Sequence, residues 1–233
     1  MATEYNIPKI VTDNLVFFLD AGNTKSYPGT GTTWTDMMGM NNGILTDGPT
    51  FNSDNGGSIV FDGDDDIVEL GSIDSSNVLS LSNPAGGGFT ISVAINWTQA
   101  GDNHPRIIER ASGGNGANGW TLYIHRSGGA VGKIRIRVNS NAYNITPSSN
   151  VTPETWEIWT FTHVNATNGA WVCYKNGISD NSGTETYAIP VTTTNARIGS
   201  WNHSTGREFK GKIGFVNVYD RVLSAAEVKQ NFD

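Results

Sequence analysis

The sequence contains a short acidic turn whose side chains could bind a hard cation. Asp62, Asp64, Asp65 and Asp66 surround Gly63 between two apolar segments. Carboxylate oxygens on a flexible loop are the ligands that Ca²⁺ prefers. Such carboxylates also occur as solvated turn residues that cap nearby backbone amides. The turn therefore predicts either a calcium site formed by these four aspartates or a solvated acidic loop, and no other cofactor is expected.

Tryptophans beside polar loops form a second group with binding chemistry. Sugar sites use exposed aromatic faces because the apolar faces of sugar rings stack on them, while nearby polar groups bind the hydroxyls. Trp97, Trp156, Trp159 and Trp171 fall within strand patterns and are predicted core residues. The predicted carbohydrate-binding residues are Trp34, Trp120, Trp201, Asn202, His203 and Arg207. The alternative is that these loop tryptophans fold back and seal an end of the core.

A basic stripe is a third candidate. Lys133, Arg135 and Arg137 alternate with the apolar residues of an expected strand, so they share one face of it. Such a face could dock on an acidic neighbouring subunit or an anionic polysaccharide. The other interpretation is a solvated outer face whose charges discourage edge pairing.

Catalytic and redox chemistry find little support in the sequence. The histidines at positions 104, 125, 163 and 203 lack metal-ligand spacing, and we expect each at the surface or a loop rim. Nucleophile-elbow, phosphate-loop and dinucleotide motifs are absent from the sequence. Cys173 is the single cysteine, so no internal disulfide forms, and we expect this residue to be a small buried or half-buried side chain.

Composition and charge restrict the partners. The chain has 233 residues and a formal net charge of −7, which argues against general affinity for nucleic acid or anionic membranes because both require excess Lys and Arg. The opening residues lack a basic segment followed by an apolar one, and no apolar stretch is long enough to span a bilayer. We therefore expect folding in a reducing cytoplasm without secretion by the usual route.

Period-2 alternation dominates the rest of the chain. It is clearest from Phe89 to Trp97, which we expect to be a half-buried strand, and it recurs at 120–124, 134–138, 156–164 and 212–219. Residues 111–119 are expected to form a loop, and the only expected helix begins after Ser224 with a capping box to Glu227. This pattern predicts an N-terminal arm at residues 1–13 and one all-β domain at 14–233.

Several segments together resemble the concanavalin-A-like, laminin-G type of jelly roll. They include residues 58–63, 89–93, 155–156, 174–177, 197–199, 209–213 and 219–227. The resemblance implies a two-sheet antiparallel sandwich with a short C-terminal helix. Glucanases of this superfamily carry Glu-x-Asp-x-Glu on one strand, which places three carboxylates on one face. This sequence has no such triplet, and Asp64-x-Asp66 lacks a third carboxylate, so we expect a non-enzymatic member.

The opening segment from Leu19 to Asp36 is similar to versions of this module in structural proteins of tailed phages. This similarity implies a virion decoration, knob or fibre protein that is made in the host cytoplasm, docks on capsid or tail proteins, and binds host-surface glycans. A homo-oligomer is compatible with such a role. The alternatives are an extracellular bacterial lectin or adhesin, with or without calcium, and a glycan hydrolase with an unusual acid pair.

Overall fold

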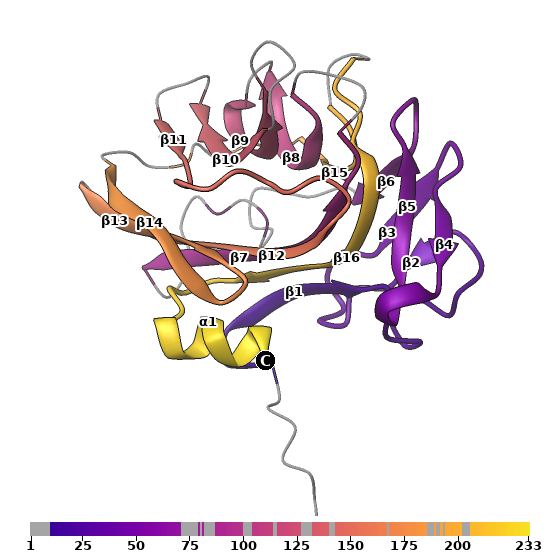
Figure 1. Ribbon diagram of the computed structural model, residues 1–233, viewed down its shortest axis with the longest axis horizontal. Coiled ribbons are helices and arrows are strands. Elements are labelled where there is room, and N and C mark those ends of the chain that lie inside the picture. The colour runs from indigo at the N-terminus through magenta and orange to yellow at the C-terminus, as the bar shows by residue number, and fades with distance from the viewer. Residues whose placement is uncertain are drawn as a thin grey trace, which may run out of the picture.

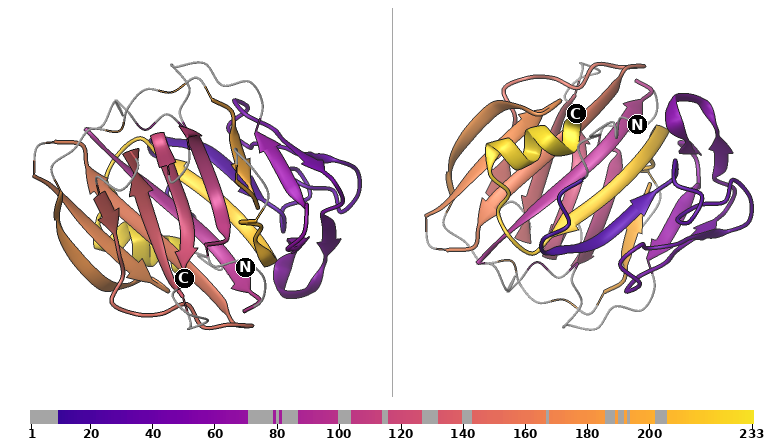
Figure 2. Two further views of the ribbon diagram at one scale, coloured as in Figure 1. Left: turned by 90° about the horizontal axis from the view of Figure 1, so that it is seen from above. Right: turned by 90° about the horizontal axis from the view of Figure 1, so that it is seen from below.

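Two antiparallel sheets pack face to face, and one helix covers part of the outer side of one sheet (Figure 1). The computed structural model describes residues 10–70, 79, 81, 87–99, 104–113, 116–126, 132–139, 143–166, 168–185, 189, 192, 194–201 and 206–233. Figure 2 shows the helix across one sheet when the molecule is seen from below, and the strands of the other sheet when it is seen from above. The predicted fold class is therefore confirmed.

We call the sheet that lies against the helix sheet A and the other sheet B. Sheet A contains β1 (Leu15–Asp20), β4 (Thr50–Asn52), β5 (Ser58–Asp62), β7 (Gly88–Trp97), β12 (Trp156–Val164), β13 (Gly169–Lys175), β14 (Ile178–Glu185) and β16 (Lys210–Tyr219). Sheet B contains β2 (Thr33–Trp34), β3 (Gly43–Thr46), β6 (Ile67–Leu70), β8 (Arg106–Gly113), β9 (Ala117–His125), β10 (Lys133–Val138), β11 (Tyr143–Ile145) and β15 (Ala196–Ile198). A short 3₁₀ turn, η1 (Asp54–Gly56), precedes β5.

The strand order puts distant parts of the chain side by side. Sheet A runs β14-β13-β12-β7-β16-β5-β4, and β1 pairs with the part of β16 beyond β5. Sheet B runs β11-β10-β9-β8-β15-β6-β3-β2. Consecutive strands β8, β9 and β10 therefore lie next to one another, whereas β15 comes from much later in the chain and pairs with β8. This crossover brings the segment after β15 close to β8.

The core lies between the sheets and follows the predicted alternation. Trp120, Leu122 and Ile124 of β9 face inward with Ile134 and Ile136 of β10. Sheet A supplies the facing layer, which includes Phe17, Leu19, Phe89, Ile91, Val93, Ile95, Trp159, Phe161, Val216 and Val218. Cys173 is fully buried in the same cluster, as predicted. Because side chains alternate along a strand, the intervening residues of β9 and β10 face outward.

Strand β7 departs from its expected half-burial. All of its residues except Asn96 are buried, including those on the face opposite the core. The hydroxyl of Ser92 pairs with that of Thr160 at 2.8 Å. Thr90 Oγ1 donates to the carbonyl of Arg221 and accepts from the backbone amide of Leu223, because the turn before the helix crosses this strand. The alternation of apolar and polar residues did not reveal that the turn before the helix covers the outer face of β7.

The helix α1 (Ala225–Phe232) forms where the sequence predicts it. Ser224 caps it, and Glu227 completes the capping box. Leu223 and Val228 both pack in a small cluster between the helix and sheet A. Arg221 forms a bidentate pair with Glu227, which holds the pKa of that carboxyl down at about 2. These contacts fix the helix on the sheet.

The two ends of the described chain meet at this helix. The backbone amide of Val11 donates to Asn231 Oδ1 at 2.8 Å, and Tyr219 Oη donates to the carbonyl of Val11 at 2.8 Å. In Figure 1 the entering chain and the C-terminus lie together beside α1. Residues 1–9 of the predicted arm lie outside the described residues.

Two strands occupy stretches that the sequence pattern did not mark. Residues 111–113 and 117–119, expected as a loop, belong to β8 and β9. Strand β14 contains no large hydrophobic residue after Ile178, and it pairs with β13 across the turn Asn176-Gly177, where both residues have positive φ. Among the described residues no helix has the length and hydrophobicity to cross a bilayer.

Candidate functional site

The outer face of sheet B brings several chemically capable side chains together. In the register of β9 and β10, Arg135 lies opposite Tyr123 and Lys133 lies opposite His125. On the other side of β9, Arg106 of β8 lies opposite Tyr123. Since these positions alternate with core residues, their side chains all project from the outer face. Tyr123 is thus flanked by cationic residues from both neighbouring strands.

Guanidinium groups and aromatic rings alternate across this face. The Cζ atoms of Arg106 and Arg137 each lie 4.9 Å from the centroid of the Tyr123 ring. Arg106 also lies 6.0 Å from the ring of Trp201, and Arg207 lies 4.2 Å from that ring. Contacts of this kind contribute about 0.5–2 kcal/mol each, depending on burial. We call Arg106, Tyr123, Arg137, Trp201 and Arg207 the arginine–aromatic face.

Two histidines border the arginine–aromatic face. The rings of His104 and His125 lie 4.8 Å apart, and His104 stacks on Tyr123 at 5.9 Å. Burial, together with the positive charges of His125 and of the arginines at positions 207, 106 and 137, lowers the pKa of His104 to about 4. Burial and the two arginines of β10 likewise lower the pKa of His125. Both imidazoles are therefore neutral at pH 7, and the positive charge of this surface belongs to the arginines. The sequence also predicts His163 at the surface or a loop rim. That prediction is wrong, because His163 is buried against Phe89.

Arg106, in the buried part of this face, pairs with a carboxylate. Arg106 Nε lies 3.0 Å from Glu109 Oε2, and both side chains have no exposed surface. Burial lowers the pKa of Arg106 to about 10, although Glu109 opposes this shift. Arg106 Nη2 and Tyr123 Oη are buried and have no hydrogen-bond partner among the described residues. His125 Nδ1 and Arg135 Nε share this state. Buried polar atoms normally pair, so these unpaired atoms mark an unusually polar layer beneath the face.

The structure places two residues of the predicted carbohydrate-binding set next to each other and buries two others. Trp201 and Arg207 meet on the arginine–aromatic face, whereas Asn202 and His203 lie outside the described residues. Trp34 and Trp120 have no exposed surface, so the prediction that they stack on a sugar is wrong. Both occupy inward positions of sheet B strands, and Trp120 Nε1 donates to the carbonyl of Leu79 at 2.9 Å.

The predicted basic stripe is divided between two roles. Arg137 belongs to the arginine–aromatic face, and Arg135 lies beside it. Lys133 Nζ instead donates to the carbonyls of Pro147 and Ser148, at 3.2 and 2.6 Å, so it stabilises that loop. The stripe and the Trp201 loop, which the sequence treats as separate, form one surface.

Sequence reasoning missed the residues at the centre of this surface. Arg106 and Tyr123 were not singled out, although Tyr123 lies at an outward position of an alternation that was recognised. The pattern Thr121, Tyr123, His125 could have placed an aromatic ring next to the arginines of β10. Arg106 gave no such signal, because a β-bulge shifts the register between it and Ile108.

The acidic turn brings together three of its four aspartates. Carboxylate oxygens of Asp62, Asp65 and Asp66 lie within 4.8 Å of one another, and Asp64 is not part of this group. Asp62 Oδ1 accepts from the amide of Asp64, and Asp66 Oδ2 accepts from the amide of Asp62. Burial, together with the charges of Asp62 and Asp65, raises the pKa of Asp66 to about 6. The oxygen-only donor set fits a hard cation, and the same hydrogen bonds are typical of a solvated turn.

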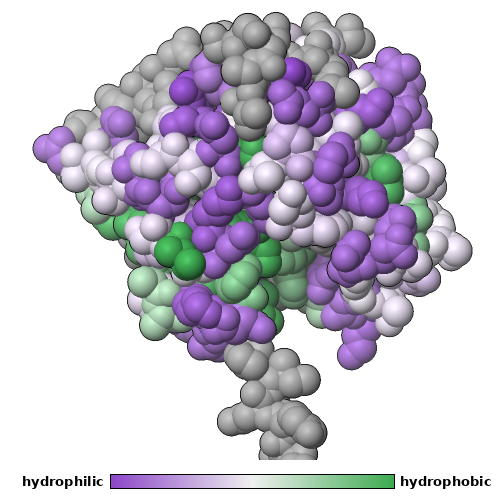
Figure 3. Space-filling model, viewed as in Figure 1, coloured by the Kyte–Doolittle hydropathy of each residue, from purple (hydrophilic) through white to green (hydrophobic). Residues whose placement is uncertain are grey.

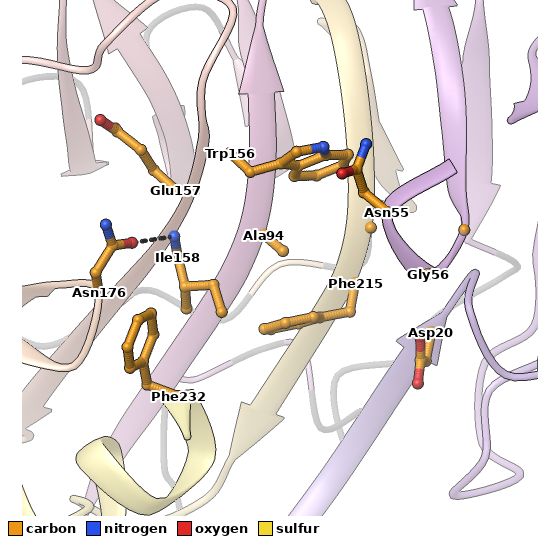
Figure 4. A pocket seen from close by; sticks show the side chains of 12 residues that line it. Asp20, Asn55, Gly56, Ala94, Trp156, Glu157, Ile158, Asn176, Phe215 and Phe232 are labelled. Atoms are coloured by element: carbon orange, nitrogen blue, oxygen red, sulfur yellow. Dashed lines mark hydrogen bonds between the residues drawn. The ribbon is translucent and has the colours of Figure 1, made fainter. Parts of the chain in front are cut away.

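A groove lies on the opposite side of the molecule, on the outer face of sheet A. Its volume is about 600 Å³, and Trp156, Phe215, Ala94 and Phe232 are among the residues that line it (Figure 4). In Figure 3, hydrophobic residues are exposed together around and above helix α1. Trp156 was predicted to be a core residue, which is wrong because it occupies an outward position of β12 and is partly exposed.

Comparison with known proteins assigns the family. Residues 62–229 match the model of the concanavalin A-like lectin/glucanases superfamily (Laminin_G_3). The chain belongs to this superfamily. No curated protein sequence matches the chain.

Solved structures with the same fold include a domain in complex with a sugar and a receptor binding domain. Domain 4 of the extracellular arabinanase AbnA from Geobacillus stearothermophilus, solved with arabinotriose, superposes with a TM-score of 0.67 at 15% identity, covering 94% of this chain and 98% of that one. The receptor binding domain of botulinum neurotoxin C/D mosaic serotype gives 0.67 at 15% identity, covering 95% and 51%. Trypanosoma rangeli sialidase gives 0.66 at 14% identity, covering 99% and 35%. At these identities the superpositions establish the fold alone.

Proposed function

We propose that this chain is a carbohydrate-binding module whose arginine–aromatic face binds an acidic glycan without cleaving it. The observation that carries the proposal is the alternation of guanidinium groups with aromatic rings on the outer face of sheet B. A carboxylated sugar needs a planar cationic donor for its carboxylate and an apolar ring face for its C–H groups. Both kinds of group are within one surface here.

The partly exposed residues of this face suggest how such a sugar would be held. Trp201 and Arg207 are partly exposed, whereas Arg106 and Tyr123 lie beneath with no exposed surface. Trp201 and Arg207 would therefore contact the sugar, and the buried Arg106 and Tyr123 would support them from beneath and add positive charge. The rings of Tyr123 and Trp201 keep Arg106 in place, which reduces the side-chain entropy lost on binding.

The fold comparisons support binding as the general role. The arabinanase domain was solved with arabinotriose, and the neurotoxin domain is a receptor binding domain. The arabinanase domain is also nearly the same length as this chain, since the superposition covers 98% of it. From those proteins we transfer to this chain only the general role, which is that of a jelly roll that binds a ligand on its surface.

The carboxylates near the arginine–aromatic face support a role without hydrolysis. Glycoside hydrolysis needs one carboxyl as acid and a second as base or nucleophile, both directed at the bond. Glu109 is paired with Arg106, and Glu208 accepts from the backbone amide of Gly206 through both oxygens. Both carboxylates therefore act within the protein, which leaves the face to bind rather than cut.

The experiment is calorimetric titration with sialyllactose and with oligogalacturonate, and with lactose as the neutral counterpart. We expect the acidic sugars to bind and lactose not to bind this face. Arg207→Gln removes one partly exposed guanidinium and should weaken binding about 10- to 100-fold, since a hydrogen bond to a charged group contributes about 1.5–3 kcal/mol. Lys212→Gln removes the same charge from sheet A and is the matched control. Equal weakening by both variants, or no binding of any acidic glycan, would contradict the proposal.

Placement on a tailed-phage particle is a narrower proposal that rests on the similarity of residues 19–36. In that setting the module would dock on capsid or tail proteins, and the acidic glycan would belong to the host surface. Electron microscopy of purified particles with a labelled copy tests it, and absence of the protein from the particles contradicts it. An extracellular lectin or adhesin is the alternative location, and mass measurement in solution tests the predicted oligomer.

Calcium at the acidic turn stays a prediction. The three convergent carboxylates of Asp62, Asp65 and Asp66 would hold it, and the ion would rigidify the loop between β5 and β6. The measurement is the melting temperature with Ca²⁺ and with chelator. A rise with Ca²⁺ that Asp65→Asn removes is the expected result, and equal values with and without Ca²⁺ favour the solvated turn.

A further inference from the structure

We propose that the groove on the outer face of sheet A is a second, separate binding site, which takes a neutral sugar. Its lining comes from β1, β7, β12, β16, η1 and α1 and from the connecting residues Gly57 and Asn176, and none of these carries a residue of the arginine–aromatic face. The groove and that face lie on the outer sides of opposite sheets. The site is therefore independent of the proposed function and can exist even if sheet B binds nothing.

The floor of the groove is low because two neighbouring positions have almost no side chain. Ala94 of β7 and Gly214 of β16 lie side by side, and a Cβ atom added to Gly214 would lie 3.5 Å from Ala94 Cβ. The same added atom would lie 3.5 and 3.6 Å from Cζ3 and Cη2 of Trp156. The six-membered ring of the indole thus reaches across the sheet above Gly214. A larger residue at either position would fill the space.

Aromatic side chains stand on both sides of this floor. Figure 4 shows Trp156 and Phe215 on two sides of Ala94, with Ile158 and Phe232 beyond Phe215. Trp156 and Phe215 are both partly exposed, although neighbouring outward residues of β7 are covered. Exposed aromatic faces separated by a shallow floor are the arrangement on which the C–H face of a sugar ring stacks.

The rim supplies hydrogen-bonding groups without cations. Asn55 lies next to Trp156 and makes no side-chain hydrogen bond within the described structure (Figure 4). Asn176 uses its Oδ1 to accept from the amide of Ile158 at 2.8 Å, which leaves its NH₂ group available. Asp20 and Glu157 also line the groove, but Glu157 is paired with Lys175, which leaves Asp20 as the carboxylate for a ligand; the described lining contains no Lys or Arg. Amides and a carboxylate bind hydroxyl groups, whereas the missing cation disfavours an acidic sugar.

The size of the groove favours a sugar over a protein as its ligand. A volume of about 600 Å³ lies within the usual range for small-molecule sites, which is about 300–1,000 Å³. A stable interface between copies of the chain would bury about 1,200–2,000 Å² in total, far more than this short groove offers. A sugar of one to a few rings fits both the dimensions and the mixed lining.

The experiment follows the indole N–H signals of the full chain by ¹H–¹⁵N NMR during titration with arabinotriose, cellotriose and maltotriose. We expect at least one trisaccharide to shift the Trp156 signal while the Trp201 signal stays in place. Trp201→Ala should leave this binding unchanged. Ala94→Leu, which keeps every aromatic residue but fills the floor, should weaken it at least about tenfold, as should Trp156→Ala.

Three outcomes would overturn the inference. The first is no shift of the Trp156 signal with any of the trisaccharides. The second is a shift that survives Ala94→Leu while the variant remains folded by its NMR spectrum. The third is a Trp156 shift that follows protein concentration together with a rise in mass, since that would make the occupant a second copy. None of these outcomes affects acidic glycan binding on sheet B, which the titrations with sialyllactose test.

Discussion

The outer faces of the two sheets differ in how they use the same backbone pattern. Sheet B places large cationic and aromatic side chains at neighbouring outward positions, where Tyr123 lies between Arg106 and Arg137. Sheet A places Ala94 and Gly214 at equivalent neighbouring positions, with aromatic residues only at the margins. The centre of one face is thus filled and charged, whereas the other face has a hollow whose lining contains no Lys or Arg among the described residues.

This difference shows that the period-2 alternation determines which residues face outward. It does not determine whether the outer face is charged and filled or contains a groove. On sheet B, the charged side chains stack on rings, and burial lowers the pKa of Arg106, His104 and His125. On sheet A, helix α1 covers one part of the surface and leaves the groove beside it. The two faces should therefore respond differently to changes in charge, salt, pH and helix stability.

The largest expected difference concerns buried polar pairs. Glu109→Gln removes the charged partner of Arg106, and breaking a buried ion pair costs about 3–5 kcal/mol. The matched change on sheet A is Ser92→Ala, which breaks the hydroxyl pair with Thr160 and should cost about 1 kcal/mol. Urea denaturation measures both free energies of unfolding. A cost for Glu109→Gln no larger than that for Ser92→Ala would show that Arg106 is solvated.

Salt should separate the two ligand sites. Raising NaCl from about 0.05 to 0.5 M shortens the screening length severalfold, so acidic glycan binding to the arginine–aromatic face should weaken several-fold. Neutral trisaccharide binding to the sheet A groove should change by less than about twofold, because no charge pair forms there. Calorimetry at both salt concentrations provides the comparison. Equal salt dependence would mean that both ligands occupy the same surface.

Acidification should strengthen binding on sheet B. A bound carboxylate would raise the pKa of His104 and His125 from their lowered values, so the complex would hold more protons than the free protein. Affinity must then rise as the pH falls from about 7.5 to 5.5, by a few-fold if one histidine is coupled. Titrations with sialyllactose across this range test the sign, and Arg207→Gln should keep the trend at lower affinity. Affinity that falls on acidification would place the histidines away from the ligand.

The smallest expected effect concerns the helix beside the groove. Glu227→Gln weakens the cap and the pair with Arg221, and should lower the free energy of unfolding by about 1 kcal/mol at pH 7. The pKa of Glu227 is lowered to about 2 from 4.5, so its contribution is complete above pH 4.5 and is lost as the pH falls toward 2. Melting temperatures of the two proteins should therefore converge in acid. Since Phe232 of α1 lines the groove, neutral sugar binding should weaken slightly while acidic glycan binding stays constant.

The sequence predicted the sandwich and its inner faces well because core alternation is a local property. The strands around Phe89, Trp120 and Trp156 and the capping box at Ser224 all follow from residues close together in the chain. The binding surfaces depend on non-local contacts. Trp201 reaches Arg106 only because β15 pairs with β8, and no local pattern shows that pairing.

The tryptophans also show how local sequence patterns fail to predict which side chains are exposed. Trp34 and Trp120 adjoin loops yet are buried, whereas Trp156 lies within a strand yet is partly exposed. Adjacency to a loop says little about exposure, because the outward or inward position within the strand decides it. For Trp156, the small residues at positions 94 and 214 on neighbouring strands determine that a hollow remains.

The contact between Val11 and Asn231 has a consequence for how this domain is presented. Any segment joined to either end of the described chain would leave from the same pole, next to helix α1. A tether at that pole would hold the sheet A side toward its anchor. The arginine–aromatic face would then point away from the anchor, toward whatever approaches from solution.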